Sequence, residues 1–492
     1  MKRYVVLAGL AFVILAGAAV WLGGLNQDEG WYLYAAQLVH EGRMPYRHFF
    51  FTQGPLFPIV YAMLTWAWSD AGLLGARVLT CVIGLFATLF AVSLARLVVP
   101  PEKRGVAGLV TFMLLGCNLY HIYYTSTPKT YALASFFALS GYYLLAFAFT
   151  DFGARWRKSI VFLAGLTMAF AAGARVSLGA LLAATGMVLL CSFRRTGWSF
   201  LWFGLGGALG LLAVYGPFLV NDAARSGLLA AQRYHMARGG FDPFFTVGSV
   251  SRLVRWYLPL FVTLGIGVFS LRRGGAGRTV VFPALVWGFV AVFVVQLLAP
   301  FPYEDYNVPV MGILAVVAAV LFADVEMKSK CLVVLGLAWA ASFGCPLLED
   351  WMTDGQDRFW TLKKERCELA QLRETARVIE ALDPGGKTLL TQDTYLAVET
   401  GRKVPGGLEM GPFSMLTDAE WRTLLTTCDA PVAALSGYTF AVEPPRCDER
   451  DWNEQKDYWS ILKTRYDLVM REESFGQNAT TLLILKLKEA GR

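Results

Sequence analysis

Two adjacent carboxylates, Asp28 and Glu29, directly follow the first long apolar segment of the chain. A carboxylate held at a membrane surface can accept a proton from a hydroxyl group and so act as a general base. Asp28 also begins a run with helical periodicity, where an aspartate commonly caps the helix by accepting a backbone N–H. The two roles are compatible, because a position at a helix start holds the carboxylate in place. We predict Asp28 as a catalytic base, with Glu29 supporting it or binding a metal ion.

A second group of candidate residues consists of cations expected on the same side of the membrane as Asp28: Arg43, Arg47, Lys129, Arg175, Arg233 and Arg238. Lys and Arg normally accumulate on the cytoplasmic side, so cations on the opposite side indicate an anionic partner. Arg binds a phosphate through two N–H groups and Lys binds it as a point charge. We therefore predict that these cations bind a phosphate group. The alternatives are a lysine that merely extends to the interface at position 129 and a basic patch at lipid headgroups around 233–238.

A third group of side chains is suited to binding a sugar or an acceptor: Tyr46, Gln53, Tyr303, Glu304, Asp305 and Tyr306. The last four stand in a proline-flanked loop, residues 300–309, at the mouth of an apolar segment. Aromatic rings pack on the apolar faces of sugars, and carboxylates accept hydrogen bonds from hydroxyl groups. The alternative for the acidic pair in this loop is a structural cap of the helix that follows.

The composition divides the chain of 492 residues into two parts. The whole chain is 56% hydrophobic and only 16% charged, whereas soluble globular chains are about 25% charged. Residues 1–346 hold 25 basic and 12 acidic residues, and residues 347–492 hold 19 and 25. We therefore predict a membrane domain over 1–346 and a water-soluble domain over 347–492. The net charge of +7 does not indicate nucleic acid, because its excess lies in loops that flank the membrane.

Eleven apolar segments are candidates for membrane-spanning helices, since a bilayer core of ~30 Å needs about 20 apolar residues. We predict spans near 4–24, 73–99, 105–121, 130–149, 159–173, 176–193, 199–220, 255–270, 279–299, 308–323 and 331–346. Clusters of two or more cations follow every second span, which predicts a cytoplasmic N-terminus. An odd number of spans then puts the soluble domain on the outer side.

Two short helices are expected in the first outer loop. Apolar residues recur at helical spacing over 31–39, and Gly42 ends this helix. The apolar stretch Pro55–Trp68 is also too short to cross a bilayer, so we predict that both helices lie in the membrane interface. The soluble domain alternates a polar helix near 358–382 and a second helix near 418–427 with strands near 387–391, 431–435, 467–471 and 481–488. This alternation predicts a small α/β domain.

The first outer loop resembles that of GT-C fold glycosyltransferases. The resemblance lies in three segments, Asp28-Glu29-Gly-x-Tyr-x-x-x-Ala, Gly42-x-x-Pro45-Tyr46 and Gln53-Gly54-Pro55-Leu56-x-Pro58. It is nearest to the bacterial relatives of protein O-mannosyltransferases and of the lipid A aminoarabinose transferase. The resemblance covers 26–60 as a motif and about 1–346 as architecture. Several relatives carry another acidic residue in the second outer loop, where this chain has Thr125-Ser126-Thr127-Pro128-Lys129.

The resemblance implies a multi-pass enzyme of the bacterial cytoplasmic membrane whose C-terminal domain is periplasmic. Such an enzyme transfers a sugar from a polyprenyl-phosphate donor to a glycan, lipid or protein acceptor, with inversion at the anomeric carbon and Asp28 as base. Some members of this fold need a divalent cation such as Mg²⁺ or Mn²⁺ and others do not. Two other functions fit the sequence. One is a transporter or flippase for a lipid-linked glycan, and the other is a non-catalytic assembly partner.

Overall fold

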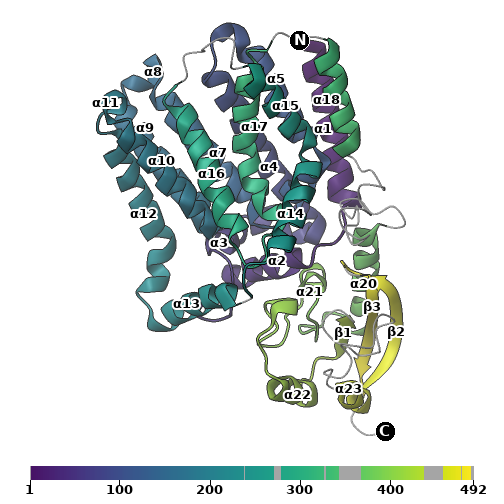
Figure 1. Cartoon of the computed structure of the whole chain (residues 1–492). Helices are drawn as coiled ribbons and strands as arrows, with labels where there is room; N and C mark the ends of the chain where they lie inside the picture. Colours follow the sequence, from purple (N-terminus) through teal and green to yellow (C-terminus); the bar gives the residue numbers. More distant parts are fainter. Residues whose placement is uncertain are drawn as a thin grey trace.

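The computed structural model describes residues 2–237, 239–270, 279–325, 329–342, 367–436, 458–477 and 479–488. It consists of a helical bundle and a smaller domain that lies at the end of the bundle away from the N-terminus (Figure 1). The longer helices of the bundle are α1 (Lys2–Leu22), α4 (Gly72–Leu97), α7 (Thr130–Ala148), α9 (Arg157–Ala174), α12 (Ser199–Leu219), α16 (Val281–Leu297) and α17 (Val308–Phe322). The shorter ones are α5 (Arg104–Gly116), α6 (Leu119–Ser126), α8 (Asp151–Ala154), α10 (Gly179–Cys191), α11 (Phe193–Thr196), α13 (Asp222–Ala237), α14 (Pro243–Trp256), α15 (Leu258–Ser270) and α18 (Ser329–Ser342).

Within the described residues, six helices are long and apolar enough to cross a membrane, namely α1, α4, α7, α9, α12 and α17 with the turn before it. The pairs α5–α6 and α14–α15 are bent by 68° and 82° at short breaks, so each pair adds at most one span. Shorter apolar helices lie over 176–191, 281–297 and 333–342. An apolar helix lies in each of the eleven predicted segments, and the end of the last segment, 343–346, lies outside the described residues. The number of crossings stays a prediction. The segment 105–121, predicted as one span, is interrupted at Asn118, whose side chain caps α6.

Helix α17 lies at the centre of the bundle. It contacts α4, α5, α7, α15 and α16, and nearly all of its side chains are buried. A helix that is apolar on every face is stable only where neighbours surround it. The turn η6 (Glu304–Asn307) leads directly into α17. The predicted loop around Glu304 and Asp305 is therefore attached to a helix that is buried on nearly every face.

The C-terminal domain is built on a three-stranded antiparallel sheet with strand order β1-β3-β2. Its strands are β1 (Val432–Ser436), β2 (Tyr466–Phe475) and β3 (Thr480–Leu487), and its helices are α20 (Glu368–Leu382), α21 (Thr394–Thr400), α22 (Asp418–Thr427) and α23 (Trp459–Arg465). The predicted α/β class is confirmed. The predicted strand over 387–391 is wrong, because Thr388 and Leu390 form only isolated bridges to Lys403 and Ala433. The first part of the predicted polar helix, 358–366, lies outside the described residues.

Helix α2 (Gln27–His40) lies across the end of the bundle, between the bundle and the C-terminal domain (Figure 1). It packs on α3 (Leu56–Met63) on one side and on α21 on the other. Gly30 permits the close approach to α21, because a Cβ atom there would lie 2.3 Å from the backbone nitrogen of Tyr395. Helix α3 is shorter than predicted, since the chain continues from Met63 into the 3-10 turns η1 (Thr65–Ala67) and η2 (Ser69–Ala71).

Candidate active site

The start of helix α2 is stabilised by Asn26 and Glu29, which form a capping box. The Asn26 side chain accepts a hydrogen bond from the backbone N–H of Asp28, at 3.1 Å, and the Glu29 carboxylate accepts one from the backbone N–H of Asn26, at 2.9 Å. The alternative role of Asp28 as the helix cap is therefore wrong. Since Asn26 caps the helix, the Asp28 carboxylate is free to point elsewhere.

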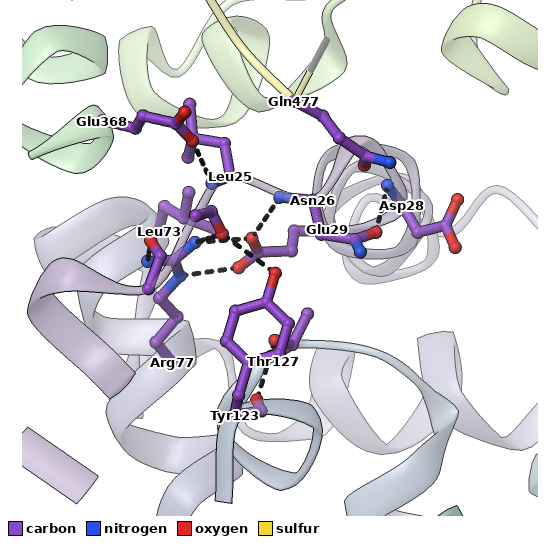
Figure 2. Close-up of polar contacts among 12 residues, drawn as sticks. Leu25, Asn26, Asp28, Glu29, Leu73, Arg77, Tyr123, Thr127, Glu368 and Gln477 are labelled. Carbon is purple, nitrogen blue, oxygen red and sulfur yellow. Dashed lines mark hydrogen bonds and ion pairs between the residues drawn. The ribbon is translucent and has the colours of Figure 1, made fainter. Parts of the chain in front are cut away.

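Glu29 is held by Arg77 of α4 beneath the start of α2 (Figure 2). Arg77 Nε and Nη2 donate to the two carboxylate oxygens of Glu29 at 2.7 and 2.6 Å, and both side chains are almost completely buried. The remaining N–H groups of Arg77 donate to the carbonyl oxygens at the end of α1, residues 20, 23 and 24. Glu29 therefore supports the loop, as one of its two predicted roles requires, and it does not face the cavity described below.

Arg77 was not among the residues that the sequence singled out. It stands near the start of the apolar segment 73–99 and was interpreted as part of a membrane span. A charged side chain inside such a segment is costly unless it is paired, so its presence there was the available signal of a buried partner.

Asp28 lies in the wall of a cavity and is held on both carboxylate oxygens. The indole nitrogen of Trp31 donates to Oδ1 at 3.1 Å, and Lys129 Nζ lies 2.8 Å from Oδ2. Lys129 also lies 3.4 Å from Asp305, whose carboxylate accepts a hydrogen bond from the hydroxyl of Tyr131 at 2.8 Å. Burial opposes the charge on Lys129, but Asp28, Tyr131 and Asp305 outweigh it and hold the pKa of Lys129 well above its usual range. The lysine is thus a permanent cation shared by two carboxylates.

Arg175 follows the last residue of α9 and lies in the same cavity. Its guanidinium stands over the rings of Tyr306 and Tyr131, 4.5 and 5.0 Å from their centroids. Its Nε atom is buried without a hydrogen-bond partner, and no carboxylate of the described residues forms an ion pair with it. Lys129 lies 5.0 Å from the centroid of the same Tyr131 ring. Two cations therefore flank one tyrosine, and one of them lacks an anionic partner within the described part of the chain.

The cavity has a volume of about 580 Å³ and is lined by many of the predicted site residues: Asp28, Gln53, Lys129, Arg175, Tyr303, Glu304, Asp305 and Tyr306. Glu304 also forms an ion pair with Arg252 of α14 at 3.2 Å. The chain thus brings together side chains from the first and second outer loops, from the link after α9 and from the last outer loop, which are separated by up to almost 280 positions.

Other predicted site residues lie away from this cavity. Tyr46 is buried, and its hydroxyl donates to the backbone carbonyl of Gln53. Arg43 forms an ion pair with Glu409 of the C-terminal domain at 3.1 Å. Arg47 and Arg233 are exposed and do not line the cavity, and Arg238 lies outside the described residues. Of the five predicted phosphate-binding cations that the structure describes, only Lys129 and Arg175 line the cavity.

A divalent metal does not fit the described residues. No group of three or more His, Cys, Asp or Glu side chains among them is arranged to hold a metal ion. The nearest pair of carboxylates, Asp28 and Asp305, shares the ammonium group of Lys129. A cationic side chain thus takes the position in which a metal would neutralise the two acids, and we assign no step to a metal.

The bundle, the helix across its end and the C-terminal domain together have the GT-C fold of polytopic membrane glycosyltransferases, as the resemblance implied. The structure matches ArnT, the lipid A aminoarabinose transferase, from Cupriavidus metallidurans in the apo state over 98% of both chains, with a TM-score of 0.65 and 13% identity. ArnT bound to undecaprenyl phosphate matches over 99% of this chain and 98% of that chain, with a TM-score of 0.65 and 14% identity.

The apo oligosaccharyltransferase of Archaeoglobus fulgidus also matches, with a TM-score of 0.52 and 11% identity over 96% of this chain and 74% of that chain. At these identities the similarity establishes the fold alone. No family model matches the sequence, and no curated protein is significantly similar to it.

Proposed function

We propose that this protein is a glycosyltransferase that moves a sugar from a polyprenyl-phosphate donor to an acceptor hydroxyl on the outer side of the cytoplasmic membrane. The observation that carries the proposal is the pair of cations, Lys129 and Arg175, beside the Asp28 carboxylate in one cavity. A phosphate ester supplies the anion that Arg175 lacks among the described residues. The ArnT structure with bound undecaprenyl phosphate supports this class of donor, since its fold is the same.

The reaction is a single displacement at the anomeric carbon. Asp28 accepts the proton of the acceptor hydroxyl, whose oxygen forms a bond to the anomeric carbon. The bond from that carbon to the phosphate oxygen breaks, and the polyprenyl phosphate leaves with the electron pair. One displacement without a covalent enzyme intermediate inverts the configuration.

Three side chains near Asp28 have roles in this displacement. Arg175 and Lys129 stabilise the negative charge that grows on the leaving phosphate, which is where fixed cations lower a barrier most. Trp31 holds the carboxylate in place, and a carboxylate oxygen bonded to Trp31 can still accept a second hydrogen bond.

The test is turnover by purified protein of a panel of short-chain prenyl-phosphate monosaccharides, measured as release of the prenyl phosphate in the presence of an extract of envelope acceptors. For the sugar that is turned over, Asp28→Asn should lower kcat by ~10²–10⁴, the usual contribution of a positioned general base. The matched control is Glu41→Gln, which removes a half-exposed carboxylate at the far end of the same helix and should leave kcat within twofold.

Near wild-type turnover by Asp28→Asn would rule out the assigned base. Release of no prenyl phosphate from any donor, together with donor movement across vesicles that lack an acceptor, would favour the flippase instead.

A further inference from the structure

The short link between α1 and α2 has an unusual set of hydrogen-bond partners. Four consecutive backbone N–H groups each donate to a side-chain oxygen: Leu25 to Glu368, Asn26 to Glu29, Gln27 to Gln477 and Asp28 to Asn26. The first N–H groups of any helix lack partners within the helix and are usually capped by residues nearby in the sequence. Here two of the four acceptors come from the C-terminal domain, more than 300 positions away.

The two remote acceptors come from separate parts of that domain. Glu368 stands in the first turn of α20 and is buried. Gln477 stands in the turn between β2 and β3, and its Oε1 accepts the N–H of Gln27 at 2.9 Å. Figure 2 shows Glu368 and Gln477 approaching the link from the side of the C-terminal domain. Gln477 also lines the cavity that contains Asp28.

A third contact reaches Asp28 through a side chain. Phe413 of the C-terminal domain packs edge-on against Trp31, with ring centroids 6.3 Å apart, and lines the same cavity. Trp31 in turn donates to the Asp28 carboxylate. The C-terminal domain therefore contacts both the backbone that precedes Asp28 and the indole that orients it.

We propose that Gln477 is a positioning residue for Asp28 and that the C-terminal domain completes the active site. The inference rests on the proposed function. The Gln477 carboxamide holds the backbone of Gln27, and this fixes the neighbouring Asp28 carboxylate relative to Lys129 and the bound substrates. A displacement of a reacting group by about 1 Å lowers a rate by up to ~10²-fold, so one well-placed hydrogen bond has a measurable effect.

The experiment compares three substitutions at position 477 in the full chain. Gln477→Ala removes the acceptor. Gln477→Asn keeps the amide, but its shorter side chain does not reach the N–H of Gln27. Gln477→Glu keeps an acceptor oxygen at the same reach. We expect Gln477→Ala and Gln477→Asn to lower kcat about tenfold while the KM for the donor stays within twofold of the wild-type value. Gln477→Glu should retain most of the wild-type kcat.

The pH profile separates positioning from general loss of structure. The new carboxylate in Gln477→Glu lies near Asp28 and disfavours its ionisation, so the acidic limb of the kcat profile should move to higher pH. The control is Lys403→Ala, which breaks an exposed contact of the same domain with Glu41, at the other end of α2, and should change neither kcat nor the profile.

A second readout needs no substrate. Hydrogen–deuterium exchange of the peptide that covers 23–31 should be faster in Gln477→Ala and Gln477→Asn than in the wild type or in Lys403→Ala. The inference would be overturned if Gln477→Ala and Gln477→Asn both had the kcat and the exchange rate of the wild type. If Asp28→Asn were inactive at the same time, the proposed function would still stand. Activity of Asp28→Asn would instead refute the proposed function. If Gln477→Ala fails to fold, Gln477→Asn decides the result.

Discussion

Asp28 and Glu29 are neighbours in the sequence, yet they lie in contrasting regions. Glu29 faces the interior, has 0% of its side chain exposed and forms a two-pronged ion pair with Arg77. Asp28 faces the cavity, keeps 23% of its side chain exposed and shares Lys129 with Asp305. A buried pair that satisfies all its hydrogen bonds stabilises one geometry, whereas a partly exposed acid in the wall of a cavity remains accessible to a substrate. One member of an adjacent acidic pair can therefore support the structure while the other is available for chemistry.

The largest effect is expected from breaking the buried pair. Arg77→Met leaves the Glu29 carboxylate buried without its cation and should lower the free energy of unfolding by about 3–5 kcal/mol. Thermal unfolding in detergent, followed by intrinsic fluorescence, measures this loss. The double variant Glu29→Gln with Arg77→Met should regain part of it. Equal stability of Arg77→Met and the wild type would contradict the structural role of the pair.

Among the cavity residues, Arg175 is the cation that forms no ion pair with a carboxylate of the described residues. Arg175→Gln should lower kcat by ~10², the cost of removing one fixed group that stabilises a developing negative charge. It should also weaken binding of undecaprenyl phosphate, measured by tryptophan fluorescence. Arg233→Gln, at an exposed position outside the cavity, is the matched control. Unchanged binding of undecaprenyl phosphate by Arg175→Gln would show that the phosphate does not bind at Arg175.

A third carboxylate, Asp393, is buried like Glu29 but forms no ion pair with any cation in the described part of the chain. Burial raises its pKa to about 6, and one oxygen accepts a hydrogen bond from the hydroxyl of Tyr395 at 3.0 Å. The pKa of Asp393 is near 4 in the unfolded chain and about 6 in the folded protein, so the folded state binds the proton more tightly. The stability that this group contributes is therefore lost as the pH rises from about 4 to about 6. The free energy of unfolding should fall by about 3 kcal/mol across this window. Thermal unfolding at pH 5 and 7.5 measures this difference in the wild type, and the Asp393→Asn variant should lack it. The same pH dependence of stability in both proteins would contradict the role assigned to Asp393.

The smallest effect is expected from removal of metal ions. Because the Lys129 ammonium bridges Asp28 and Asp305, turnover should stay within twofold after dialysis against EDTA. Lys129→Met should abolish most activity, and added Mg²⁺ or Mn²⁺ should not restore it. Complete loss of activity in EDTA, reversed by Mg²⁺ or Mn²⁺, would show that the lysine does not replace a metal.

The capping arrangement was within reach of the sequence. Asn26 with Glu29 three positions later is a typical capping pattern, and it would have assigned the helix cap to Asn26 and left Asp28 for chemistry. The bend at Asn118 was harder to predict, because hydropathy measures the length of an apolar segment and is insensitive to its direction.

The sequence by itself determined the apolar segments, the α/β class of the last domain and the candidacy of Asp28, Lys129, Arg175 and Asp305. Such features depend on composition, periodicity and charge within a few dozen residues. Only the tertiary structure decided that Arg77 binds Glu29, that Arg43, Arg47 and Arg233 lie away from the cavity and that Phe413 and Gln477 line it. Pairings between residues separated by tens or hundreds of positions arise from helix packing and domain docking, and no local pattern in one chain records them.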